Sequence, residues 1–329
     1  MDARLVALER WLAALFPDIP LALAPASEDA SFRRYFRARL DDGRSFVAMD
    51  APPDREDCRP FLHVAGLLRD AGLHAPQVHA QDLQQGFLLL SDLGTTTYLD
   101  ALDAGCADAL FGDASEALVR WQLASRPGAL PPYDEALLRR EMELFPQWYL
   151  ARHLGVEPSA AQRGTLDGIF ALLARSALAQ PVVFVHRDYM PRNLMVCDPN
   201  PGVLDFQDAV LGPITYDVVS LFRDAFLSWE EERVLDWTAR YWERARKAGL
   251  PVGPDFAAFY RDFEWMGLQR HLKVLGIFAR INYRDGKPKY LSDTPRFLGY
   301  ARAVATRYAQ LAPLARLLDE LQGRQPCAR

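Results

Sequence analysis

Two apolar segments in the middle of the chain lead directly into aspartates, and this feature limits the folds that the chain can adopt. The run Val182–Val185 precedes "HRDYMPRNL", and a second, shorter run precedes "DFQDAV". Short apolar runs bounded by polar turn residues predict buried strands. Acidic side chains are rarely buried without a partner or a function. The pattern therefore marks Asp188, Asn193 and Asp205 as candidates for one functional site.

The spacing of these three residues is typical of phosphoryl transfer. H-R-D with an Asn five residues after the Asp, followed by a strand that carries a second Asp, is the signature of a kinase catalytic loop. Asn193 and Asp205 supply the oxygen ligands that Mg²⁺ prefers, and Asp188 would accept the proton of the nucleophile or orient its hydroxyl. A lone aspartate at a strand end is also a common turn former. The joint pattern is much rarer and favours a kinase.

Composition and charge exclude several other classes of protein. The chain has 329 residues, a formal net charge of -5, a pI of about 5.7 and no basic block, which disfavours nucleic-acid and membrane-surface binding. None of the four cysteines forms a C-x-x-C pair, so no zinc site or disulfide framework is indicated. The first residues lack the apolar core of a signal peptide. They predict an amphipathic helix with Leu5, Leu8, Leu12 and Leu15 on one face. We expect a cytoplasmic enzyme without an obligate protein partner.

The order of predicted elements indicates a bilobal α+β fold. Residues 1–90 read as a small β-rich lobe that binds nucleotide, with a hairpin at "DDG", and residues 91–95 read as a hinge. Residues 96–329 read as a larger, mainly helical lobe that carries the catalytic loop and the acceptor site. Its helical periodicity covers 106–125, 134–153, 160–179, 215–227, 230–248, 255–280 and 294–322.

The central motifs resemble the aminoglycoside phosphotransferase/choline kinase branch of the protein-kinase-like fold. That branch has a G-x-P-x-x-x-D element after the metal aspartate, matched here by Gly212, Pro213 and Asp217. The resemblance implies that Asp217 accepts backbone N–H bonds from the catalytic loop. Stretches such as "DASFRRYFR", "LLLSDLG" and "RHLKVLGIFARINYRDGKPKYLSDTPR" are similar to those of kinases that phosphorylate the C1 hydroxyl of N-acetylmuramate or N-acetylglucosamine in peptidoglycan recycling. The resemblance thus implies ATP, Mg²⁺ and an amino sugar as ligands.

Two departures from the kinase pattern concern the phosphates of the nucleotide. A Gly-rich loop is missing, and the segment 26–32 with Ser31 would take its place. The strand lysine of V-A-I-K is replaced by Met49, which cannot neutralise phosphate. The chain is therefore either a nucleotide-binding pseudokinase or a kinase in which another cation substitutes, and the intact Asp188, Asn193 and Asp205 favour the second alternative.

Arg34 is the first candidate for the substituting cation. The period of two in a strand places it on the apolar face with Phe36, where an arginine needs an anion. The alternative is an internal salt bridge of Arg34 to Glu56 or Asp57. Arg33 lies on the polar face and is expected to be solvated unless the strand twists. Arg33 and Arg192 are the candidates that follow Arg34.

Further residues are expected around the site in lesser roles. His186 is expected to be part of the scaffold, Arg192 either offsets transition-state charge or is solvated, and Asp208 lies beside metal or substrate. Backbone groups near Leu90, Ser91 and Asp92 would pair with adenine. The alternative acceptors are an aminoglycoside, choline or homoserine.

Overall fold

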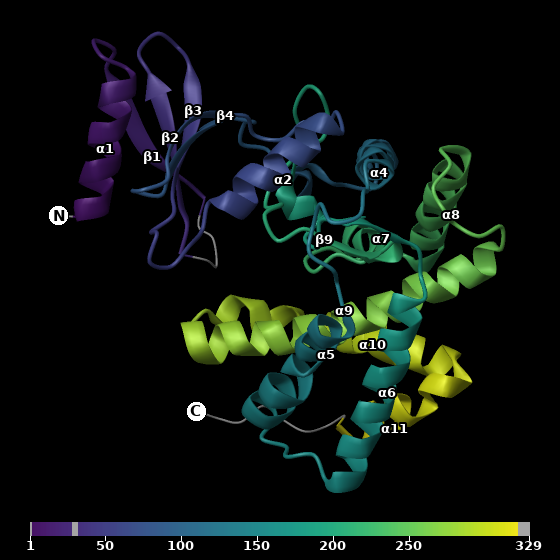
Figure 1. The fold of residues 1–329 in the computed structure, drawn as a ribbon. Helices are drawn as coiled ribbons and strands as arrows, with labels where there is room; N and C mark the ends of the chain where they lie inside the picture. Colours follow the sequence, from purple (N-terminus) through teal and green to yellow (C-terminus); the bar gives the residue numbers. More distant parts are fainter. Residues whose placement is uncertain (1, 28–31, 322–329) are drawn as a thin grey trace. The chain divides into compact units, whose positions relative to one another are not determined.

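The computed structural model describes residues 2–27 and 32–321, which form two compact units. Unit 1 comprises Met1–Cys106 and Arg192–Asp208, and unit 2 comprises Ala107–Pro191 and Ala209–Arg329. The predicted α+β class is confirmed, since an antiparallel sheet and a large set of helices are both present (Figure 1). The lobe boundaries expected near residues 90–96 stay a prediction.

A five-stranded antiparallel sheet forms the core of unit 1. The strands follow the spatial order β1-β2-β3-β5-β4. The bounds of the elements up to residue 106 are α1 (Ala3–Leu15), β1 (Leu21–Ser27), β2 (Arg34–Leu40), β3 (Ser45–Asp50), α2 (Arg59–Asp70), β4 (Val78–Asp82), β5 (Phe87–Ser91) and α3 (Tyr98–Ala101). The predicted hairpin joins β2 to β3 and sets their register.

Helix α1 covers one face of this sheet, as Figure 1 shows. Leu8 and Leu12 lie one helical turn apart, are fully buried, and pack in one cluster with Ala38 and Phe87 of the sheet. The Asp2 side chain caps the helix by accepting hydrogen bonds from the backbone of its first turn. The predicted amphipathic helix is therefore confirmed for Leu8 and Leu12, whereas Leu5 is half-buried and Leu15, at the end of the helix, is exposed.

Strand β1 was not predicted. Its sequence, "LALAPAS", is rich in alanine and contains Pro25, and both residue types are depleted in strands. Proline has no backbone N–H to donate, and this is tolerated because β1 lies at the edge of the sheet. The register of the β1–β2 pairing shifts directly after Pro25.

A short strand pair from the middle of the chain completes unit 1. β7 (Leu194–Met195) and β8 (Gly202–Val203) are antiparallel. Val203 donates a backbone hydrogen bond to His74 at 2.7 Å, and the ring of Phe206 packs on Phe61 of α2 at 4.7 Å between centroids. Residues far apart in sequence thereby share one core.

Unit 2 is mainly helical, with one pair of strands. The strands β6 (Val182–Val185) and β9 (Val210–Pro213) are antiparallel. The helices are α4 (Ala107–Leu123), α5 (Glu135–Met142), the π-helical η1 (Phe145–His153), α6 (Ala160–Leu178), α7 (Thr215–Phe222), α8 (Glu231–Lys247), α9 (Phe256–Asp285), η3 (Pro288–Asp293), α10 (Thr294–Arg307), η4 (Ala309–Leu311) and α11 (Ala312–Leu321).

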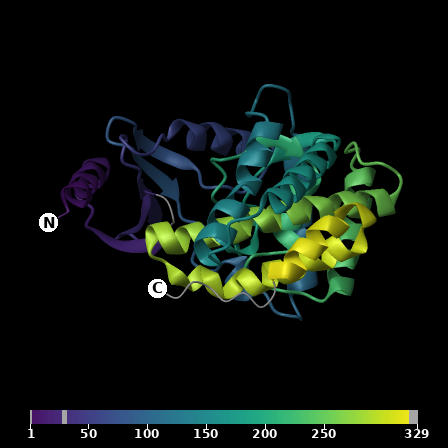
Figure 2. The ribbon, with the colours of Figure 1, turned by 90° about the horizontal axis from the view of Figure 1, so that it is seen from below.

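The long helix α9 organises unit 2. It packs against η1, α10, α7 and α6, and Figure 2 shows the course of these helices. Gly276 permits the close contact with η1, since a Cβ there would lie 2.3 Å from the carbonyl carbon of Leu144. Asp255 caps the helix at its start, and Gly286, at a φ of 69°, ends it in the left-handed conformation.

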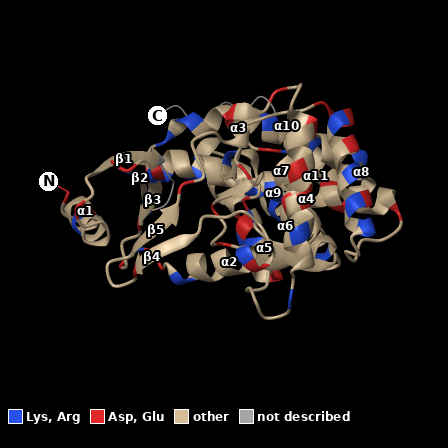
Figure 3. Cartoon of the chain, turned by 90° about the horizontal axis from the view of Figure 1, so that it is seen from above, with Lys and Arg blue, Asp and Glu red and all other residues tan. Residues whose placement is uncertain are grey.

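Charge is spread over both units. Figure 3 shows acidic and basic positions interspersed along the helices. Within residues 2–27 and 32–321, no helix combines the length and apolar character needed to cross a membrane.

Candidate active site

The loop that contains Asp188 follows directly from strand β6. A side chain of helix α7 fixes its backbone through hydrogen bonds. Asp217, in the first turn of α7, is fully buried and accepts backbone hydrogen bonds from His186 at 2.7 Å and Arg187 at 3.0 Å. Burial raises the pKa of Asp217 to about 7, although these two bonds act in the opposite sense. This is the contact that the resemblance implied.

Arg187 carries backbone strain immediately before Asp188. Its φ is 77°, a conformation that is unusual for a residue with a long side chain. Such strain persists only where surrounding contacts over-determine it, and it is common at functional sites. Here the Asp217 carboxylate fixes the backbone of Arg187, while Glu141 of α5 fixes its guanidinium.

A buried set of charges lies around that guanidinium. Glu141 accepts from Arg187, from Lys273 of α9 at 3.0 Å, and from the Tyr133 hydroxyl. Burial alone would raise the pKa of Glu141, but Lys273 and Arg187 outweigh it and lower the pKa to about 2. Lys273 also donates to the Tyr216 hydroxyl at 2.9 Å. One negative and two positive charges therefore support the loop.

Asn193 and Asp205 lie together in unit 1. Asn193 directly precedes β7, and Asp205 follows β8 by one residue, so the pairing of these strands places the two side chains side by side. The Asn193 Nδ2 donates to an Asp205 oxygen at 3.3 Å, and the Leu204 amide donates to the Asn193 carbonyl at 2.9 Å.

The surroundings of Asp205 suit a magnesium ligand. Its second carboxylate oxygen accepts from Gln207 Nε2 at 2.8 Å, and its φ of 61° lies in the left-handed region. A carboxylate and an amide oxygen are hard donors of the kind that Mg²⁺ takes together with phosphate and water. The donor set therefore fits the ion that the sequence predicts.

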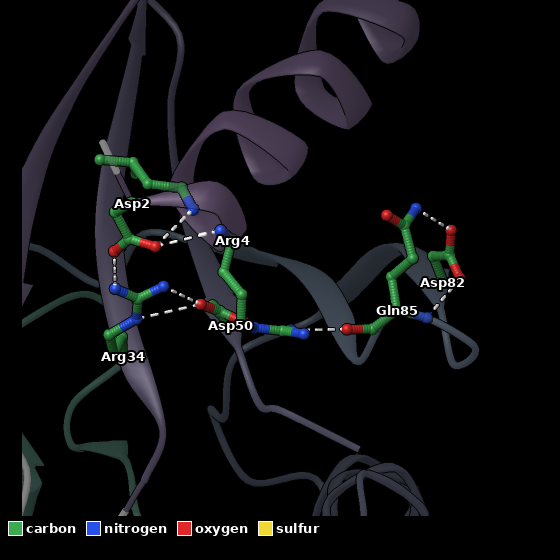
Figure 4. A network of polar contacts seen from close by, with 7 residues as sticks. Asp2, Arg4, Arg34, Asp50, Asp82 and Gln85 are labelled. Atoms are coloured by element: carbon green, nitrogen blue, oxygen red, sulfur yellow. Dashed lines mark hydrogen bonds and ion pairs between the residues drawn. The ribbon is translucent and has the colours of Figure 1, made fainter. Parts of the chain in front are cut away.

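Arg34 is engaged in structural ion pairs. It binds the fully buried Asp50, with Nε 3.0 Å from the nearer carboxylate oxygen, and it also binds Asp2. Arg4 approaches the other oxygen of Asp50 at 2.8 Å (Figure 4). An internal salt bridge was one alternative for Arg34, but the partners considered, Glu56 and Asp57, were wrong. The β2–β3 register places Arg34 opposite Asp50 instead.

Arg33 pairs with an acidic residue near the start of α2. Its Nη2 lies 3.1 Å from a Glu56 carboxylate oxygen, and both side chains are largely buried. The expectation of a solvated Arg33 is therefore wrong. Glu56 also accepts the Phe32 amide at 3.2 Å. Burial lowers the pKa of Arg33, but the charges of Tyr35, Glu56 and Asp208 outweigh it and raise the value. Arg33 therefore lies within electrostatic range of the segment that follows Asp205.

The other residues expected at the nucleotide lie in different surroundings. Met49 is fully buried in β3, and Ser31 lies outside the described residues. Leu90 and Ser91 end β5, and the Ser91 amide donates to Gln77 at 2.9 Å. The Asp92 carboxylate accepts from Arg37 at 2.7 and 3.0 Å. Their pairing with adenine stays a prediction.

The three remaining candidates differ in burial. His186 is buried, and its Nδ1 accepts the Asp188 amide at 3.3 Å. Arg192 is half-buried in a turn of 3₁₀ helix, and Asp208 is exposed. Their roles in the reaction stay predictions.

Glu141 and Lys273 are two residues of the site that were not predicted from the sequence. A signal was present, because Lys273 interrupts the apolar run "LKVLG" in the middle of a long helix. A lysine there must be paired if it is buried. The partner could not be found in the same way, since Glu141 comes from a different helix.

A loop with an Asp fixed by a buried carboxylate in unit 2, and an Asn–Asp oxygen pair beside a five-stranded antiparallel sheet in unit 1, are features of the protein-kinase-like phosphotransferases. The chain belongs to the phosphotransferase enzyme family, whose model matches residues 22–260.

Curated relatives share most of the sequence. The chain is 57% identical to an N-acetylmuramate/N-acetylglucosamine kinase of Pseudomonas aeruginosa, with 97% of each chain covered. It is 52% identical to a protein of the same name from Neisseria meningitidis serogroup B, covering 97% of this chain and 96% of that one. These identities show that the chain is an enzyme of the kinase type.

Solved structures share the fold at low identity. Choline kinase LicA from Streptococcus pneumoniae matches with a TM-score of 0.66 and 11% identity, over 92% of this chain and 100% of that one. The ADP-bound aminoglycoside phosphotransferase APH(2'')-Ib matches with a TM-score of 0.60 and 14% identity, over 91% and 98%. These similarities concern the fold alone.

Proposed function

We propose that this chain transfers the γ-phosphoryl group of ATP, with Mg²⁺, to the anomeric C1 hydroxyl of N-acetylmuramate or N-acetylglucosamine. The observation that carries the proposal is the identity of 52–57% to kinases named for these two sugars, over nearly the whole chain. A role in peptidoglycan recycling and a cytoplasmic location, where ATP is available, follow from the same proposal.

The chain's own residues divide the reaction between them. Asp188 orients the C1 hydroxyl and takes its proton as the new O–P bond forms and the bond to the leaving ADP breaks. Asn193 and Asp205 would hold Mg²⁺, which neutralises charge on the phosphates. Asp217 and Arg187 keep the loop in its strained conformation, supported by the contacts described above.

Arg33 supplies the cation that the strand lysine provides in other kinases. In protein kinases that lysine is paired with a glutamate of a nearby helix. In this chain Arg33 is likewise a cation paired with a glutamate, Glu56, which lies just before α2. The two residues occupy other elements than the lysine and glutamate of protein kinases. Arg34 is less suited, because Asp50 and Asp2 already bind its guanidinium.

An acceptor screen with a blocked sugar tests the proposal. ADP release is measured with ATP and Mg²⁺ in the presence of N-acetylglucosamine and of its 1-O-methyl glycoside, in which every other hydroxyl is free. We expect turnover with the free sugar alone. Phosphorylation of the methyl glycoside would assign the acceptor to another hydroxyl.

The screen also separates the alternatives. Turnover with an aminoglycoside, choline or homoserine, and none with either amino sugar, would identify a kinase for another acceptor. Nucleotide binding without turnover on any acceptor would identify a pseudokinase.

A further inference from the structure

Three basic residues follow one face of α9. Lys273 and Arg280 are seven residues apart, so their directions around the helix differ by only about 20° and their positions along the axis by about 10 Å. Arg284 continues the same face one turn later. Exposure rises along the row, from 11% of the Lys273 side chain through the half-buried Arg280 to 55% for Arg284. Helix α9 is labelled in the charge-coloured view of Figure 3.

The first member of this row belongs to the support of the reacting loop. Lys273 binds Glu141, which in turn binds Arg187, the residue before Asp188. Burial lowers the pKa of Lys273, but the surrounding charges, including that of Asp188, outweigh it and raise the value. The row therefore begins within electrostatic range of Asp188 and runs outward to the surface.

Arg280 differs from its two neighbours in the row because it has no counter-ion. Neither a hydrogen bond nor an ion pair joins it to any residue in the described ranges 2–27 and 32–321, and its Nε is buried without a partner. Burial and the adjacent Arg284 lower the pKa of Arg280, while Asp285 acts in the opposite sense. Asp285 is already bound to Arg284 at 2.7 and 2.9 Å.

An arginine in this state is suited to an anionic ligand. Partial burial of an unpaired guanidinium is unfavourable, and a carboxylate removes that cost through two parallel charge-assisted hydrogen bonds. The separation of Arg280 from Lys273 is of the order of the length of a substituted pyranose. For a carboxylate on its far side to reach Arg280, a sugar with its C1 hydroxyl at Asp188 must lie along this face of α9.

We propose that Arg280 binds the carboxylate of an anionic sugar acceptor and thereby sets the preference for N-acetylmuramate over the neutral N-acetylglucosamine. The inference rests on the proposed function, since it requires a sugar with its C1 hydroxyl at Asp188. Arg280 is a specificity-determining residue in this proposal, and the phosphoryl transfer itself does not depend on it.

Steady-state kinetics of Arg280→Gln with the two sugars test the assignment. We expect kcat/KM for N-acetylmuramate to fall by about tenfold to a hundredfold, the range that loss of a charge-assisted hydrogen-bonded pair produces. The value for N-acetylglucosamine should change by less than about twofold, because that sugar has no carboxylate. Arg280→Lys should retain part of the preference, since it keeps the charge but not the planar fork.

Arg284→Gln is the matched control. It removes the same charge one turn away on the same face, from a residue that is bound to Asp285, and should leave the ratio of the two sugars unchanged. An equal loss with both sugars in Arg280→Gln, or an unchanged ratio, would overturn the proposal.

The methyl ester of N-acetylmuramate gives a test on the wild-type protein that does not depend on the folding of any variant. Masking the carboxylate should remove the advantage of N-acetylmuramate, and an ester used as well as the free acid would also overturn the proposal. If the wild type phosphorylates neither sugar, the proposed function fails and this inference fails with it. If it phosphorylates both and only the ratio test fails, the proposed function stands without this assignment.

Discussion

Asp217 holds the backbone of His186 through a hydrogen bond of 2.7 Å in a place that water does not reach. Burial of that carboxylate raises its pKa from 3.8 to about 7. A group whose pKa is higher in the folded state binds more protons there than in the unfolded chain, so its contribution to stability is lost as the pH rises through the folded value.

We therefore predict that the wild type loses stability relative to Asp217→Asn between about pH 4 and pH 7. Across this window the free energy of unfolding of the wild type should fall, relative to that of the variant, by on the order of 4 kcal/mol, since one pKa unit corresponds to about 1.4 kcal/mol. Urea unfolding of both proteins across this range measures it. Parallel pH dependences would show that Asp217 does not titrate in the window.

Replacing Glu141 should damage both stability and turnover. Glu141→Gln leaves Arg187 and Lys273 buried without their shared counter-charge, which typically costs about 3 kcal/mol or more. Thermal unfolding and kcat measure the two effects. Glu135→Gln on the same helix is the control, because the pair of Glu135 with Arg139 is exposed and contributes little.

Arg33→Met should raise the KM for ATP by about tenfold, because the phosphates lose a charged donor. Arg34→Met should instead lower the melting temperature, since Asp50 would remain buried with fewer partners. Nucleotide kinetics and thermal unfolding of both variants separate these effects. The opposite pattern would return the phosphate role to Arg34.

Asp205→Ala should weaken nucleotide binding in the presence of magnesium more than in its absence. The carboxylate is expected to balance a metal that bridges phosphate oxygens. Calorimetric titration of nucleotide with Mg²⁺ and with a chelator tests this. Equal losses under both conditions would assign Asp205 a structural role.

Asp188→Asn should abolish turnover and leave ATP affinity nearly unchanged, because Asp188 acts on the hydroxyl nucleophile and not on the nucleotide. Single-turnover kinetics and equilibrium nucleotide binding provide the two measurements. A variant that keeps near-wild-type turnover would remove Asp188 from the catalytic role.

The local part of the fold could be predicted from sequence because local patterns determine it. Leu8 and Leu12 face the sheet as their spacing indicates, and the "DDG" turn joins β2 to β3. The strands that precede Asp188 and Asp205, β6 and β8, follow from short apolar runs with polar boundaries. These features depend on residues that are close together along the chain.

Contacts between distant segments could not be predicted in this way. The pairing of Arg34 with Asp50 depends on strand register, and that of Lys273 with Glu141 depends on how two helices pack. Strand β1 was not predicted because Pro25 argues against a strand, and the proline is tolerated there because the strand lies at an edge of the sheet. In each case tertiary context decides what the local sequence leaves open.

The inclusion of Arg192–Asp208 in unit 1 has a consequence for dividing the protein into fragments. A fragment that ends at Cys106 would lack β7 and β8, leaving the backbone carbonyl of His74 without the Val203 amide and the ring of Phe61 without that of Phe206. A fragment of unit 1 that folds on its own must therefore also contain β7 and β8, for example joined through a short linker after residue 106.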